Sequence, residues 1–485
     1  MLNHSSNGLL LIKHKKKYMF AAISMVLIVL FFLFTSPIEG LNIASWRMLG
    51  LIIIMVGLWI LDLFPLAVVG LIPLVYAPLM GVADIKAILP YYSESVIFLT
   101  LGGLALGVAM ETSGLHKRIA LFTLSKVGSS LSIQLFAFMG TTALLSMWIN
   151  NTSTVVMLLP VAISVINALS ITTKDNNFAK ALLLGMAYAA SIGGIGTLIG
   201  TSTNFVMVGI LESQANIKID FLDWMKIGVP LMLILLVVAY FLIIYLFKIN
   251  KMKIDSAFNF KAEYDKLGLI TNTEKLVIAI FFITAFLWMF KALINDIFAI
   301  KLSDEITSVF AFTLLFTVPT SLKEKRFVLN MDDFKKIQFH ILLLLGGGMA
   351  LAGLSSKTGL DLYVSTKLAF LSAIPVYLMI LGIVTLIIFT TELTSNNAIV
   401  ASFLPLFIVF AKSFGINPLL LALPLTLSAS LAFMLPVATP PNAVIFSSGQ
   451  IKITDMVKTG VWLNLICIAI VSIYSYYVIP YIFNL

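Results

Sequence analysis

The chain has 485 residues, of which 60% are hydrophobic and only 11% are charged, and its formal net charge is +9. A soluble protein of this length needs far more polar surface, and no polar stretch is long enough to form a soluble domain. Apolar stretches long enough to cross a bilayer recur along the whole chain. Because backbone in lipid must satisfy its own hydrogen bonds, these stretches predict an all-α polytopic membrane protein.

The first expected helix spans residues 18–34 and directly follows a lysine-rich segment at 13–17. A secretory signal peptide would have a shorter apolar core and a small-residue cleavage site, so we expect an uncleaved first helix. The basic flank places the N-terminus in the cytoplasm. The single cysteine, Cys467, excludes an internal disulfide, and the four histidines are too scattered to predict a metal site.

Further crossings follow in chain order. They are expected at residues 46–61, 64–80, 95–113, 180–198, 227–247, 276–293, 306–319, 339–355, 418–435 and 457–482. Basic residues place the connections at 248–275 and 321–336 in the cytoplasm, and the C-terminus then lies outside. This arrangement requires the apolar regions near 130–168 and 371–411 to enter and leave on the same side. Each has a polar cluster in its middle, as expected of a re-entrant hairpin.

An internal repeat relates the two halves of the chain. The sequence around Gly114 recurs around Gly359, 245 residues later, and the sequence around Asn151 recurs around Asn396 at the same spacing. A third similarity relates 200–204 to 438–442 at a spacing of 238 residues. An odd number of expected crossings separates Asn151 from Asn396, so the copies are predicted to have opposite orientations, as in the inverted repeats of secondary transporters.

The repeat divides the chain into four parts. They are a cytoplasmic N-terminus with the first helix (1–45), a first repeat (46–247) with its hairpin near 130–168, a cytoplasmic loop (248–275) and a second repeat (276–485) with its hairpin near 371–411.

The polar clusters of the two hairpins have the same pattern. Ser146 precedes Asn150 by four residues, as Thr391 precedes Ser395, and an asparagine follows in each case. Hydroxyl and amide oxygens suit sodium, whereas amide N–H groups and helix N-termini suit carboxylate or sulfate. Such residues can also serve only to join helices. Because two such clusters are paired by the repeat, we favour ion and substrate binding over a role in joining helices.

Each cluster is matched by a break in a later helix. Residues 191–200 are too rich in glycine for a continuous helix, and 436–441 contain three prolines. Unwound segments offer carbonyl groups to a cation and half-helix N-termini to an anion. The sequence therefore predicts two sodium sites with an anion site between them.

Other features limit the alternatives. The acids Glu111 and Glu392, in or near the membrane, could relay protons or accept structural hydrogen bonds, and the latter is favoured. His116, Lys117 and Arg118 are interpreted as a solvated cytoplasmic surface. No nucleophile–base constellation, P-loop or dinucleotide fingerprint occurs, which argues against an enzyme, an organic cofactor or direct use of ATP. The repeat with paired hairpins argues against a channel, and we expect no nucleic-acid partner.

At these motifs the chain resembles the divalent anion/sodium symporter (DASS) family, which includes dicarboxylate, citrate and sulfate carriers. Asn150, Asn151 and Thr152 resemble its first Ser-Asn-Thr signature, and the second signature and the C-terminal one resemble 395–397 and 430–442. The similarity extends from about residue 45 to the end. It implies a homodimer with about eleven transmembrane helices and two re-entrant hairpins, in which a transport domain moves like an elevator against a scaffold.

The resemblance also implies roles for individual residues. The first sodium site falls at Ser146, Asn150, Asn151 and Gly200, and the second at Thr391, Ser395, Asn396 and Ala438. The substrate-binding positions are Asn151, Thr152, Asn396, Asn397, Thr439 and Pro440. Three positions depart from the family pattern, since Asn150 replaces a serine, Thr203 stands where many members have proline, and Asn397 replaces a threonine that touches substrate.

We therefore expect a sodium-coupled importer of a small divalent anion, a C4-dicarboxylate such as succinate, in a bacterial inner membrane. The change at Asn397 leaves a sulfate or citrate carrier, or an anion exchanger on the same fold, open as alternatives.

Overall fold

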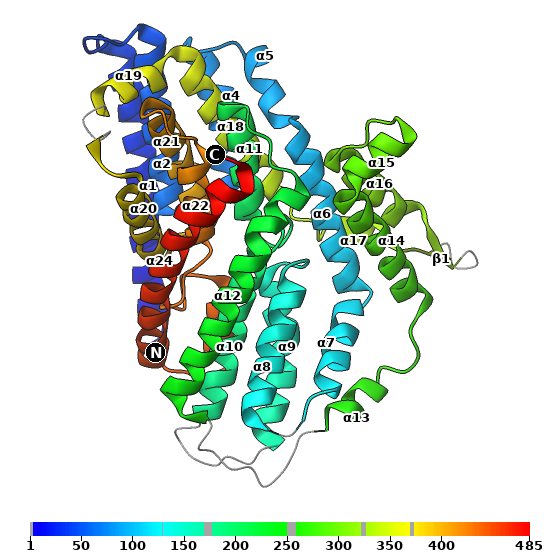
Figure 1. The fold of residues 1–485 in the computed structure, drawn as a ribbon. Helices are drawn as coiled ribbons and strands as arrows, with labels where there is room; N and C mark the ends of the chain where they lie inside the picture. Colours follow the sequence, from blue (N-terminus) through cyan, green and yellow to red (C-terminus); the bar gives the residue numbers. More distant parts are fainter. Residues whose placement is uncertain (1–2, 129, 169–176, 250–258, 322–325, 369–372) are drawn as a thin grey trace.

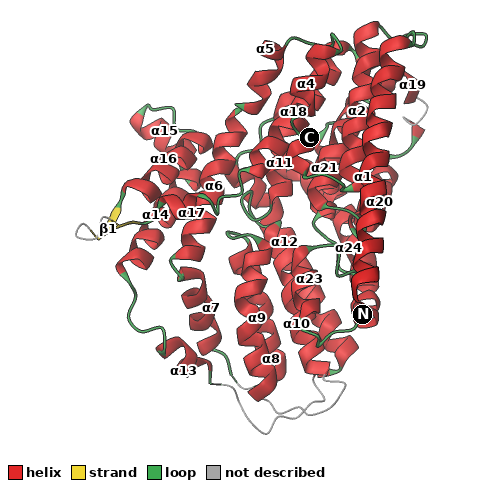
Figure 2. Cartoon of the chain, turned by 180° about the vertical axis from the view of Figure 1, so that it is seen from behind, coloured by secondary structure: helices red, strands yellow, loops and turns green. Residues whose placement is uncertain are grey.

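The computed structural model describes residues 3–128, 130–168, 177–249, 259–321, 326–368 and 373–485. These residues are helical almost throughout (Figure 1, Figure 2). The exception to the all-α prediction is a small antiparallel pair of strands, β1 (Pro319–Ser321) and β2 (Arg326–Phe327), in a loop between two helices. Parts of the two predicted cytoplasmic loops (250–258 and 322–325), and 371–372 of the second predicted hairpin, lie outside the described residues.

The elements of the first half follow the predicted order. They are α1 (Asn3–Phe34), α2 (Ile43–Leu61), α3 (Leu66–Val69), α4 (Ile72–Leu79), α5 (Ile85–Ile88), the 3₁₀ helix η1 (Leu89–Tyr92), α6 (Ser95–Thr112), α7 (Leu115–Ser125), α8 (Leu131–Ser146), α9 (Asn151–Ala168), α10 (Asn177–Gly194), α11 (Ser202–Ala215) and α12 (Phe221–Phe247). The predicted crossing at 64–80 is interrupted between α3 and α4.

The second half contains the matching helices. They are α13 (Phe260–Asp265), α14 (Asn272–Met289), α15 (Lys291–Phe298), α16 (Asp304–Thr317), α17 (Met331–Phe334), α18 (His340–Thr358), α19 (Leu360–Leu368), α20 (Val376–Thr391), α21 (Asn396–Ser413), α22 (Leu419–Ala429), α23 (Pro440–Ser447) and α24 (Ile453–Phe483). Among the described residues, nine helices are long and apolar enough to cross a membrane, and α8, α20 and α22 are among the shorter apolar ones.

Local sequence explains several of these boundaries. Thr271 and Glu274 form a reciprocal capping box at the start of α14, and Thr439 caps α23 just before Pro440. Gly114 and Gly359 both have φ +78°, a left-handed conformation that glycine adopts without steric cost. They occupy the same place in each half, between α6 and α7 and between α18 and α19.

The helices pack as two groups. The hairpin group, α8–α12 with α20–α24, surrounds the helix breaks, and α8, α9, α10 and α12 lie side by side in Figure 1. The flanking group comprises α1–α6, α14–α16 and α18, and α14–α16 lie beside α6. The groups touch chiefly where α11 packs on α18 and α2 packs on α21.

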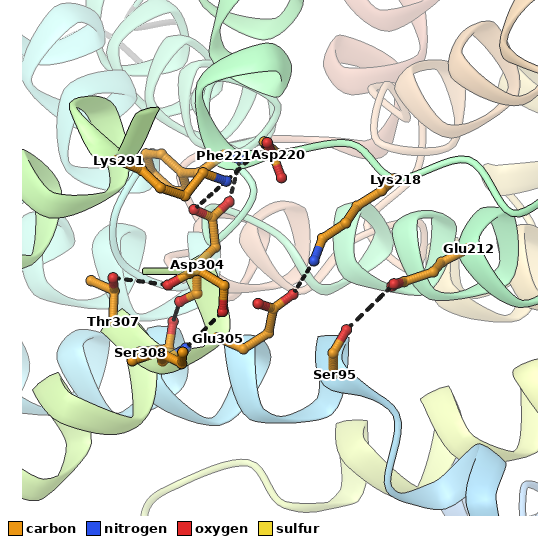
Figure 3. Close-up of polar contacts among 12 residues, drawn as sticks. Ser95, Glu212, Lys218, Asp220, Phe221, Lys291, Asp304, Glu305, Thr307 and Ser308 are labelled. Atoms are coloured by element: carbon orange, nitrogen blue, oxygen red, sulfur yellow. Dashed lines mark hydrogen bonds and ion pairs between the residues drawn. The ribbon is translucent and has the colours of Figure 1, made fainter. Parts of the chain in front are cut away.

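Ion pairs between α15, α16 and the start of α12 join the two groups (Figure 3). Lys291 of α15 lies 2.8 Å from Asp220, which precedes α12, and 3.0 Å from Asp304 of α16. Asp304 also accepts a hydrogen bond from the Phe221 N–H at 2.9 Å. Because Asp304 is only 2% exposed, this carboxylate depends on these partners for its charge.

A second ion pair tethers α7. Arg118 and His116 are buried rather than solvated, which corrects the interpretation of this basic segment. The Arg118 Nε donates to Glu274 at 2.6 Å, and its guanidinium also donates to the Gly268 carbonyl at 2.9 Å. The charge is therefore neutralised by Glu274 in the first turn of α14, which is remote from Arg118 in sequence.

Candidate functional site

A polar cavity with a volume of about 710 Å³ lies where α9, α11, α21 and α23 begin. Helix N-termini carry partial positive charge and free N–H groups, so their convergence favours a bound anion. The cavity wall comes from both halves of the hairpin group and from the ends of α2 and α18. It is lined by Asp62, 150–153, 200–202, Gln338, His340, Ile341, 393–397 and 437–441.

An oxygen cluster lies behind the first hairpin tip. The Ser146 Oγ is 2.6 Å from the Asn151 Oδ1 and 2.7 Å from the Ala190 carbonyl oxygen, although a hydroxyl has only one hydrogen to donate. The same end of the Asn151 amide lies 3.3 Å from the Ala190 and Gly200 carbonyl oxygens. If the amide were rotated by 180°, its nitrogen would donate hydrogen bonds to these carbonyl oxygens. A sodium ion bound among the carbonyl oxygens would instead keep the amide oxygen facing them.

Glycine makes this cluster possible. A Cβ atom built on Gly194 would lie 2.6 Å from the Asn151 Oδ1, which is closer than a real Cβ approaches another atom. The glycine-rich break after α10 therefore allows the hairpin tip to approach the backbone closely.

The second hairpin has the same arrangement. The Thr391 Oγ1 lies 2.7 Å from the Asn396 Oδ1 and 2.9 Å from the Ala429 carbonyl oxygen. One hydroxyl hydrogen again faces two acceptors, so oxygen atoms are in excess. The two halves of the chain thus build equivalent clusters from equivalent residues.

Two buried asparagines hold the helix breaks in shape. The Asn204 amide donates to the carbonyls of Gly194 and Thr197 at 3.1 and 2.8 Å. Asn442 donates in the same way to Ala432 and Leu435, at 3.2 and 3.1 Å. No role was predicted for these asparagines from the sequence, although both stand within matching segments of the repeat.

Glu392 stabilises only the second break. Its carboxylate accepts hydrogen bonds from the backbone N–H groups of Phe433, Met434 and Leu435 at 2.7–3.1 Å, and from the Asn464 amide at 2.7 Å. The structure therefore gives Glu392 the hydrogen-bonding role favoured from the sequence.

The structure brings the predicted site residues together. Those that line the cavity are Asn150, Asn151, Thr152, Gly200, Ser395, Asn396, Asn397, Ala438, Thr439 and Pro440. Ser146 and Thr391 lie behind them, hydrogen-bonded to the asparagines. Asn150 is less directly placed to bind sodium, because its Oδ1 accepts a hydrogen bond from the Thr152 N–H at 2.8 Å. Lining residues that were not predicted from the sequence include Asp62, Gln338 and His340 of the flanking group, and Ser202, which begins α11.

Comparisons with known proteins identify a family and several relatives. The family model described as the sodium:sulfate symporter transmembrane region matches residues 14–482. The sodium-dependent dicarboxylate transporter SdcS of Staphylococcus aureus is 33% identical over 98% of this chain and 94% of its own. SdcS of Staphylococcus saprophyticus is also 33% identical, over 87% and 84% of the two chains.

Solved structures share the fold at low sequence identity. The chain is 13% identical to MtrF of Neisseria gonorrhoeae, with a TM-score of 0.57 over 93% of this chain and 97% of that one. The YdaH transporter of Alcanivorax borkumensis is also 13% identical, with a TM-score of 0.53 over 89% and 97%. At this identity the likeness concerns the fold alone.

Proposed function

Because the chain belongs to the sodium:sulfate symporter family, we propose that it is a secondary active transporter that carries a small divalent anion together with sodium. The family and the similar curated proteins are transporters, which confirms the prediction that the chain is not an enzyme. It is an integral membrane protein with multiple apolar helices.

One observation carries the proposal. Two equivalent oxygen clusters, around Ser146 and Thr391, lie on either side of one cavity into which several helix N-termini point. Oxygen atoms in excess of donors suit a hard cation such as sodium, whereas helix N-termini and amide N–H groups suit an anion. Cation and anion would then bind as neighbours, and each would lower the electrostatic cost of binding the other.

The family resemblance, together with this chemistry, supports the following residue assignments. The first sodium ion would bind at Ser146, Asn150, Asn151 and Gly200, and the second at Thr391, Ser395, Asn396 and Ala438. The anion would lie between them, against Asn151, Thr152, Asn396, Asn397, Thr439 and Pro440. Asn151 and Asn396 belong to both sets and would link ion binding to substrate binding.

We infer a C4-dicarboxylate such as succinate as the substrate and import as the direction. The name of the SdcS relatives, sodium-dependent dicarboxylate transporter, supports this choice. Asn397 supports the alternative of sulfate, citrate or anion exchange, because an amide in the cavity wall presents a different set of hydrogen bonds from a hydroxyl.

Transport requires the site to face each side of the membrane in turn. The separation into a hairpin group and a flanking group supports an elevator motion of the first against the second. We propose eleven crossings in two inverted repeats (46–247 and 276–485), a homodimer, and a bacterial inner membrane with the N-terminus in the cytoplasm and the C-terminus outside.

Uptake into proteoliposomes tests the proposal. We expect labelled succinate to accumulate only with an inward sodium gradient, with a rate that rises more than linearly with sodium concentration. Asn151→Ala and Asn396→Ala should each nearly abolish uptake while the protein stays folded, whereas the surface variant Asn484→Ala should resemble wild type. Sodium-independent uptake in either cavity variant would show that these asparagines only join helices.

A further inference from the structure

Ser202 occupies a distinctive place in the cavity wall. It is the first residue of α11, and its Oγ donates a hydrogen bond to the Asn397 Oδ1 at 2.9 Å. Both residues line the cavity, although 195 positions separate them in sequence. The bond therefore joins the helix break of the first half to the hairpin tip of the second.

This hydrogen bond determines which end of the Asn397 amide can contact a bound anion. With Oδ1 held by the serine hydroxyl, the two N–H groups of Nδ2 have no hydrogen-bond partner among the described residues. The reversed amide would direct an oxygen toward a bound anion, which is electrostatically unfavourable. When an anion is present, the orientation in which Ser202 donates is therefore preferred.

We propose that Ser202 is a positioning residue that holds Asn397 as a pure donor, so that this end of the site selects a fully ionised oxyanion group. An amide nitrogen has two donors and no acceptor, so it favours a carboxylate oxygen over the N–H₂ of an amide or the O–H of a protonated acid. This inference rests on the proposed function, because it assigns the recognition of the transported anion.

The Thr152 end of the anion site lacks an equivalent hydrogen bond. By the spacings of the repeat, the equivalents of Ser202 and Asn397 are Pro440 and Thr152. Proline has no side-chain donor, and the Thr152 hydroxyl has no fixed partner among the described residues. A hydroxyl can donate or accept, so we expect strict selection of an ionised group at the Asn397 end and tolerance at the Thr152 end.

Kinetics of Ser202 variants in proteoliposomes test this role. Loss of one positioning hydrogen bond in Ser202→Ala should raise the KM for succinate about three- to tenfold and leave the maximal rate and the sodium dependence nearly unchanged. Ser202→Thr keeps the hydroxyl and should restore most of the affinity. In an Asn397→Ala background, Ser202→Ala should change KM less than twofold, because its effect acts through Asn397.

A substrate analogue adds a second readout. Wild type should bind the diamide of succinate, which presents an amide to Asn397 whichever way it lies, much more weakly than the monoamide, whose carboxylate can face Asn397. In Ser202→Ala the freed amide can rotate to accept from the ligand N–H₂, so the ratio of the two inhibition constants should fall at least threefold. An unchanged ratio together with additive effects of Ser202→Ala and Asn397→Ala would overturn the positioning role while leaving sodium-coupled transport intact. If wild type showed no sodium-dependent anion uptake, the proposed function would itself fail, and this inference with it.

Discussion

Glu392 offers a strong test of how the second helix break supports ion binding. One carboxylate oxygen accepts from the Phe433 N–H and the Asn464 amide, and the other accepts from the Leu435 N–H, while the Met434 N–H reaches both. These backbone groups belong to the unwound segment that leads to Ala438, a proposed sodium ligand. In Glu392→Gln, one acceptor oxygen is replaced by an N–H₂ group that faces backbone donors.

The size of the effect follows from the bonds lost. At least one buried backbone N–H loses its acceptor, which costs about 1–3 kcal/mol, and the remaining bonds lose the strengthening that a charged acceptor gives. If the substitution destabilises the ion-bound protein by about 2 kcal/mol more than the ion-free protein, sodium affinity weakens roughly 30-fold. We therefore expect the sodium concentration for half-maximal uptake to rise by at least tenfold.

The assay is the sodium dependence of succinate uptake in proteoliposomes, with thermal unfolding measured in parallel. Glu39→Gln, a change at an exposed acid in the loop before α2, is the matched control and should resemble wild type. Unchanged sodium activation in a folded Glu392→Gln protein would refute the reasoning, because the segment would then keep its shape without the carboxylate.

Three further predictions concern topology, packing and specificity. In a Cys467→Ala background, a cysteine at Lys261 should react only with reagents added from the cytoplasmic side and one at Asn216 only from outside, and reaction of both from one side would contradict the inverted repeat. Lys291→Met leaves a buried carboxylate without its cation and should lower stability by about 3–5 kcal/mol, read as a lower unfolding temperature. Asn397→Thr should shift the preference among succinate, citrate and sulfate by about tenfold in competition assays, with little change in sodium activation.

Strong local patterns made much of the fold predictable. Polar clusters in the middle of apolar regions predicted hairpins near 130–168 and 371–411, and the structure has the helix pairs α8–α9 and α20–α21 there. The spacing of 245 residues paired Asn151 with Asn396, and both lie in equivalent oxygen clusters. These features depend on hydropathy and on repetition, which a single sequence displays directly.

Contacts between distant segments were not predictable in this way. Nothing local to Ser202 indicates that it meets Asn397, and the acid at Glu392 could not be matched to the N–H groups of 433–435. Arg118 was misread because a run of basic residues indicates charge but not the partner that buries it. Such contacts arise from tertiary packing, which brings together residues whose sequence separation carries no local signal.

The proposed coupling between sodium and anion can be traced through single side chains. Asn396 directs an oxygen into its cluster, Asn151 would do so around a bound sodium ion, and both line the cavity. A sodium ion on the oxygen would polarise the amide and make its N–H groups stronger donors. Hydrogen bonds that involve charged groups contribute about 1.5–3 kcal/mol of stability, compared with about 0.5–1.5 kcal/mol for neutral groups. By linkage, an anion on the N–H groups raises sodium affinity by the same factor. Truncating either asparagine should therefore weaken both ligands together, whereas a change at Ser202 should affect the anion alone.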